Sequence, residues 1–197
     1  MTEKQNDITG SKYHKTKEQL EKEVLLIKSA QDDPANFQPL YEEYFKVIFN
    51  FIYRRTSDEQ LTADITSTVF LKALVNIKKF VPRSVPFSSW LYRIAMNEVN
   101  LYFRKNRNSR TINYSDEHLK NIAQETEVSP DIEAEKKLLD AISKLPSEAI
   151  QLIEMRFFED KSFAEIADIY GITEANAKMK VYRILEKLKH VIGNKSK

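Results

Sequence analysis

Residues 161–189 read KSFAEIADIYGITEANAKMKVYRILEKLK, and this stretch decides how the second half of the chain folds. Ser162 and Glu165 have the spacing of a capping box, in which each side chain accepts a hydrogen bond from the backbone N–H of the other residue. Thr173 is a second N-cap candidate, and Gly171 favours the positive φ at which a preceding helix ends. The pattern predicts a short helix, a tight turn and a longer helix, which is the helix-turn-helix layout.

Two faces can be assigned to the longer helix. Its apolar positions recur at helical spacing: Ala177, Val181, Ile184, Leu185 and Leu188. The opposite side carries amide and basic groups: Asn176, Lys178, Lys180, Arg183 and Lys187. A helix with such a face can lie in the major groove and neutralise phosphates, although an ordinary helical hairpin with a solvated lysine face fits the same pattern.

The composition bounds the class of protein. The 197 residues are 42% hydrophobic and include only three glycines and six prolines, which disfavours a turn-rich all-β fold. Cysteine is absent, so disulfides, thiolate metal sites and a cysteine nucleophile are excluded. The net charge is only +2, so any nucleic-acid site must come from local clustering of cations. The polar N-terminus and the lack of a long apolar run predict a cytoplasmic protein without membrane insertion.

Helical periodicity extends through most of the chain. It predicts helices over residues 17–30, 37–56, 57–79 and 89–105, with a Ser57–Gln60 capping box opening the third and Ser88 capping the fourth. The predicted fold is all-α, with two small helical domains joined by a flexible acidic linker. We expect an N-terminal extension with a short helix (1–33), a first domain (34–110), a linker (111–130) and a second domain (131–197).

No constellation in the sequence indicates catalysis. His14, His118 and His190 are far apart and have no partners at metal-ligand spacing. Three isolated glycines cannot form a phosphate-cradling loop. The sequence therefore predicts a protein that is not an enzyme and has no catalytic residues, metal or cofactor.

The segment FSSWLYRIAMN at residues 87–97 combines aromatic and cationic groups and is followed by a basic tail. Single-stranded nucleic acid needs this combination, because unstacked bases stack on aromatic rings and phosphates need counter-charge. The alternative is that Trp90 and Tyr92 close the end of the helical core.

Three motifs in order resemble bacterial RNA polymerase sigma factors of the extracytoplasmic-function (ECF) type. DITSTVFLKAL from Asp64 is similar to the family's polymerase-binding helix, and residues 87–97 resemble its promoter-melting segment. The region from Leu145 to Arg183 resembles its domain that reads the upstream promoter element. The resemblance covers roughly residues 34–192 and implies a protein that binds core polymerase and directs promoter-specific initiation.

The resemblance also implies partners and site residues. Contacts with the β′ clamp coiled coil would come from Asp64, Ser67, Thr68 and Phe70. Recognition and melting of the −10 element would involve Asn76, Lys79, Arg83, Trp90, Arg93, Asn97 and Arg104, with the loop at 80–87 holding a flipped base. DNA binding at the −35 element would involve Thr173, Asn176, Lys178, Met179, Lys180, Tyr182 and Arg183, with Lys180 on phosphate. The β flap, promoter DNA and an anti-sigma factor complete the expected partners.

The sequence departs from the family pattern at a few positions. Two prolines stand in a −10 loop that is often glycine-rich, and Ala177 and Met179 replace a usual β-branched and a usual small polar residue. These changes affect the expected base preference and not the fold. Two other hypotheses remain at this stage: a stand-alone duplex-binding regulator, and a helical interaction module that does not bind DNA.

Overall fold

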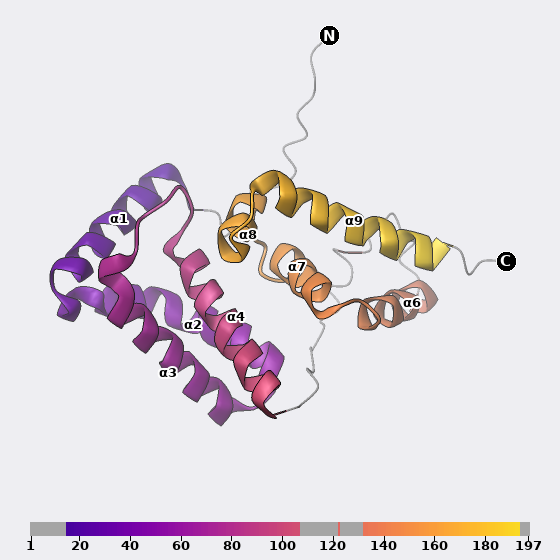
Figure 1. Ribbon diagram of the computed structural model, residues 1–197, viewed down its shortest axis with the longest axis horizontal. Coiled ribbons are helices and arrows are strands. Elements are labelled where there is room, and N and C mark those ends of the chain that lie inside the picture. Colours follow the sequence, from indigo (N-terminus) through magenta and orange to yellow (C-terminus); the bar gives the residue numbers. More distant parts are fainter. Residues whose placement is uncertain (1–14, 107–121, 123–131, 194–197) are drawn as a thin grey trace, which may run out of the picture.

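The computed structural model describes residues 15–106, 122 and 132–193, and all regular elements in these ranges are helical. The first group of elements is α1 (Lys17–Asp32), η1 (Pro34–Phe37), α2 (Gln38–Thr56), α3 (Glu59–Asn76), η2 (Ile77–Lys79) and α4 (Phe87–Asn106). The second group is α6 (Ile132–Ser143), α7 (Ser147–Phe157), α8 (Phe163–Tyr170) and α9 (Glu174–Gly193). Figure 1 shows the two groups as neighbouring helical bundles, in agreement with the predicted all-α class.

The helix-turn-helix is confirmed in its details. The Ser162 side chain accepts from the backbone N–H of Glu165 at 3.1 Å, and the Glu165 carboxylate accepts from the N–H of Ser162 at 2.9 Å. Gly171 ends α8 at φ 66°, in the left-handed region that favours glycine. On α9 the buried side chains are those of the predicted apolar face: Ala177, Val181, Leu185 and Leu188.

Two of the predicted helix starts are wrong. Ser57 lies at φ 51° and closes α2, because its N–H bonds to the carbonyl of Tyr53. An N-cap needs an extended backbone, and Asp58 has it, so the Asp58 carboxylate caps α3 instead. At α4, the expected cap Ser88 lies inside the helix and is buried, since α4 already begins at Phe87.

The extension and the first domain share one core. Ile27 and Ala30 of α1 are fully buried in the same apolar cluster as the central side chains of α2, α3 and α4. Helix α1 therefore packs as part of the first bundle.

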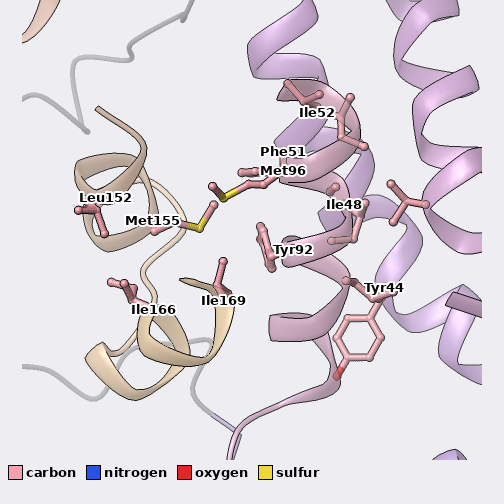
Figure 2. Packing of buried hydrophobic residues seen from close by; sticks show 14 of the residues in the cluster. Tyr44, Ile48, Phe51, Ile52, Tyr92, Met96, Leu152, Met155, Ile166 and Ile169 are labelled. Carbon is pink, nitrogen blue, oxygen red and sulfur yellow. The ribbon is translucent and has the colours of Figure 1, made fainter. Parts of the chain in front are cut away.

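The two bundles pack directly against each other through α4 and α8. Figure 2 shows Met155 and Ile169 of the second bundle pointing toward Met96 and Tyr92 of the first. A buried ion pair joins Arg55 on α2 to Glu154 on α7, at 2.5 Å. The expected flexible linker at 111–130 lies outside the described residues except for Ile122, which is fully buried.

Candidate nucleic-acid interface

A cleft of about 540 Å³ opens between the end of α3, the loop at 80–86 and the first half of α4. Its lining includes six of the seven residues predicted for the −10 element: Asn76, Lys79, Arg83, Trp90, Arg93 and Asn97. They come from the end of α3 with η2 (Ile77–Lys79), from the loop itself and from α4. Arg104 is exposed near the end of α4 and does not line the cleft.

Aromatic rings form the inner wall of the cleft. The half-buried Trp90 indole lies 4.8 Å from the Phe80 ring and 5.4 Å from the Phe87 ring, measured between centroids. Phe87 is fully buried beneath it. Because the supporting rings are packed, the indole is held in one orientation and can offer a surface on which a base stacks.

The structure separates the two alternatives left open for Trp90 and Tyr92. Tyr92 is 1% exposed, and its hydroxyl donates to Glu159 at 2.8 Å, so it closes the core. Burial, followed by the charge of Glu159, raises the pKa of Tyr92 well above its ordinary value. Trp90 lines the cleft instead.

Three of the cations that line the cleft have partners in this arrangement. Lys72 pairs with Glu98 at 2.5 Å, and Arg83 pairs with Asp168 of α8 at 2.5 Å. The Arg93 guanidinium donates to the backbone carbonyls of Asp168 and Ile169. Those carbonyls belong to the last turn of α8, which carries the negative end of the helix dipole.

The predicted −35 residues lie along the start and outer side of α9. Thr173 acts as the predicted cap, because its hydroxyl accepts from the N–H of Asn176 at 3.3 Å. Lys178, Met179, Tyr182 and Arg183 are exposed, whereas Asn176 is half-buried. Lys180 forms an ion pair with Glu148 of α7 at 2.7 Å. The outer side of α9 therefore offers cationic, amide and aromatic groups together.

The predicted polymerase-binding residues divide between two sides of α3. Asp64 and Ser67 are exposed, and Thr68 is half-buried with its hydroxyl donating to the carbonyl of Asp64 at 2.9 Å. Phe70 is 4% exposed and packs edge-on against Tyr41, and its contact with the polymerase stays a prediction. Its ring supports α3 from the core side.

Sequence reasoning missed two apolar side chains on the outer side of α3. Leu71 is 61% exposed and Val75 is 70% exposed. They follow Asp64 and Ser67 at helical spacing, which places all four on one side of the helix. The sequence pattern could have indicated this exposure, because Leu71 and Val75 do not belong to the helical row of Ile65, Val69 and Ala73 that faces the core.

Comparison with known proteins matches each half of the chain to a described protein family region. Residues 40–109 match the family description Sigma-70 region 2, and residues 135–188 match Sigma-70, region 4. Together the two matches span more than half of the chain.

The chain belongs to the sigma-70 family.

Its relatives within that family include sigma factors of the ECF type. It is similar to the ECF RNA polymerase sigma factor BldN of Streptomyces coelicolor, at 31% identity over 173 residues, which are 85% of this chain and 64% of BldN. It is similar to the ECF RNA polymerase sigma factor SigM of Bacillus subtilis, at 26% identity over 152 residues, which are 76% of this chain and 91% of SigM. The chain is therefore an RNA polymerase sigma factor of the ECF type.

The fold agrees with a solved relative. The structure of CnrH, solved in complex with the cytosolic domain of CnrY, matches with a TM-score of 0.58 at 18% identity, covering 88% of this chain and 99% of that one. The match to region 2 disfavours a stand-alone duplex-binding regulator, because region 4 alone would suffice for that role. Over the described ranges, no helix combines the length and apolar character that crossing a bilayer requires.

Proposed function

We propose that this sigma factor divides promoter recognition between two surfaces. The cleft beside Trp90 captures non-template bases extruded from the −10 element, and the outer side of α9 reads the −35 element in the major groove. The observation that carries the proposal is the convergence of six predicted −10 residues on one aromatic and cationic cleft. Unstacking bases costs a few kcal/mol per step, so promoter melting requires a surface whose contacts with the extruded base offset this free energy.

Polymerase binding is assigned to the outer side of α3. Asp64, Ser67, Thr68, Leu71 and Val75 combine exposed polar and apolar groups there. An exposed apolar pair ringed by polar residues is typical of a protein-binding surface. Core polymerase, through its β′ clamp coiled coil and β flap, is the proposed partner, and an anti-sigma protein is the proposed regulator.

A low net charge is compatible with a protein that binds DNA while it is attached to polymerase. A formal charge of +2 provides little non-specific attraction to DNA. Two weak DNA-reading surfaces held on one large enzyme act at high effective concentration, so neither must bind tightly alone.

Run-off transcription with core polymerase tests the proposal. Transcripts that start at one promoter and require the added chain are expected. Trp90→Ala is expected to reduce open-complex formation, measured by permanganate reactivity of unpaired thymines, more than closed-complex binding. Leu25→Ala is the control, since Leu25 is 65% exposed on α1 and does not line the cleft. Tight operator binding without polymerase, or equal loss in both complexes with an unfolded variant, would contradict these roles.

A further inference from the structure

Helix α1 precedes the residues that match region 2, yet it touches both ends of the loop that borders the cleft. The loop runs from Phe80 to Pro86, between η2 and α4, and five of its residues line the cleft: Phe80, Val81, Arg83, Val85 and Pro86. What fixes the two ends of this loop therefore fixes one wall of the cleft.

Glu23 holds the end of the loop that leads into α4. Its carboxylate is 3% exposed and accepts from the backbone N–H of Phe87 at 2.8 Å. It also accepts from the Tyr44 hydroxyl and pairs with Lys15 at 2.7 Å. The first N–H groups of a helix lack intrahelical partners and lie at the positive end of its dipole, so a carboxylate there both satisfies and stabilises the start of α4.

This contact acts close to Trp90. Phe87 is the first residue of α4, and Trp90 lies three positions later on the same first turn. The Phe87 ring lies 5.4 Å from the Trp90 ring and 5.2 Å from the Phe80 ring. A displacement of the Phe87 backbone would move the indole and the ring that supports it together, because interiors are close-packed.

Gln31 holds the other end of the loop. Its side-chain amide donates to the carbonyl of Ile77 at 2.9 Å and to the carbonyl of Phe80 at 2.7 Å. Ile77 begins η2, and Phe80 begins the loop and contributes a ring to the cleft. Both N–H donors of the Gln31 amide thus bind backbone carbonyls of the segment that leads into the loop.

The spacing between the two anchors is set by a rigid element. Glu23 and Gln31 lie eight residues apart on α1, which is about 12 Å along a helix axis. Ile27, between them, is 1% exposed and fixes α1 on the bundle.

We propose that α1 is a positioning element for the melting cleft. Glu23 and Gln31 hold the two ends of the 80–86 loop at the separation that keeps Phe80 and Trp90 facing an extruded base, and thereby set the efficiency of strand capture. This role rests on the proposed function of the cleft. It assigns a contribution to promoter melting to two residues that do not line the cleft.

Two variants with matched controls test the role. Glu23→Gln keeps the shape but replaces a carboxylate that accepts from three groups, and Gln31→Ala removes both amide donors. Glu21→Gln and Lys28→Ala are the controls, because both residues are exposed on the same helix. Circular dichroism melting establishes that each variant is folded. If Glu23→Gln does not fold, Gln31→Ala alone decides the outcome, since Gln31 is half-buried at the periphery.

The first readout uses polymerase reconstituted with each variant. The probe is the promoter fragment transcribed by the wild-type holoenzyme, and assembly with core polymerase is measured in parallel. Loss of one or two hydrogen bonds that orient the loop is expected to lower open-complex formation about three- to tenfold, with assembly unchanged. If the two residues only stabilise the fold, the variants would instead lose assembly with core polymerase and thermal stability together with open-complex formation.

The second readout uses the free chain. Trp90 is the sole tryptophan, so acrylamide quenching of its fluorescence reports on the cleft directly. Both α1 variants are expected to increase quenching and shift the emission to the red, whereas the controls match the wild type. Variants that equal their controls in both readouts would overturn the inference. A wild-type chain that fails to open any promoter would refute the proposed function, and the quenching measurement would still decide whether α1 positions the cleft.

Discussion

Arg55→Met should destabilise the protein far more than removal of a surface charge. The Arg55 guanidinium is 5% exposed and pairs at 2.5 Å with Glu154, which is 2% exposed. It also donates to the carbonyl of Phe51 at 2.8 Å and lies 3.6 Å from the centre of the Phe51 ring. Its removal leaves a buried carboxylate without the neighbouring cation, which costs about 3–5 kcal/mol in comparable buried pairs.

Urea denaturation followed by circular dichroism measures this effect. The free energy of unfolding should fall by about 3–5 kcal/mol in Arg55→Met, and replacing both Arg55 and Glu154 by Met should recover much of the loss, because an apolar pair of similar volume carries no desolvation penalty. Lys22→Met is the control, since Lys22 and Glu18 form a pair that is 71% and 76% exposed and such pairs contribute about 0–1 kcal/mol.

The same experiment tests the packing of the two bundles. Arg55 belongs to α2 and Glu154 to α7, so loss of the pair should also separate unfolding into two transitions. An Arg55→Met variant that loses less than about 1 kcal/mol and unfolds in one transition would refute the reasoning. It would mean that the pair is solvated and does not join the bundles.

Three further outcomes are expected. Tyr92→Phe should reduce the loss of stability above about pH 10, measured by thermal unfolding. The raised pKa keeps the phenol of Tyr92 neutral in the folded chain at a pH where the unfolded phenol ionises. The stability that the neutral Tyr92 contributes is therefore complete below the unfolded pKa and is lost as the pH rises above it. An unchanged alkaline slope would contradict this. Asp168→Asn should tighten binding of an oligodeoxythymidylate to the free chain in low salt, measured by fluorescence anisotropy, since Arg83 loses its 2.5 Å carboxylate partner; equal affinity would count against the cleft. Arg183→Ala should weaken −35 recognition by about 1–3 kcal/mol if the guanidinium reads a base edge, and an unchanged footprint would exclude that role.

Local chemistry made much of the second bundle predictable. The capping box at Ser162, the left-handed Gly171 and the Thr173 cap each depend on residues three or four positions apart, so their partners are written in the nearby sequence. The same reasoning failed at Ser57, where two adjacent cap candidates compete. Asp58 caps α3, and Ser57 takes the left-handed conformation that ends α2.

Long-range polar contacts could not be predicted in the same way. The carboxylate that holds the start of α4 belongs to Glu23, 64 residues earlier, and sequence reasoning placed the cap on the adjacent Ser88. The partner of Arg55 lies 99 residues away in sequence. Neither pairing leaves a periodic signal, because a charged residue at a buried position of an amphipathic pattern does not indicate which distant element will neutralise it.

Arg93 has intramolecular acceptors that its predicted role in binding the −10 element did not indicate. The resemblance implies that Arg93, within the segment at 87–97, binds promoter DNA, and in the free chain its acceptors come from the last turn of α8. Asp168 of the same helix also pairs with Arg83 in the 80–86 loop. A DNA phosphate entering this side of the cleft must replace those acceptors, since the same donors cannot serve both partners at full strength. For a cleft that binds DNA as proposed, packing of α8 against α4 is expected to lower its DNA affinity in the free chain, and separation of the two helices is expected to raise it.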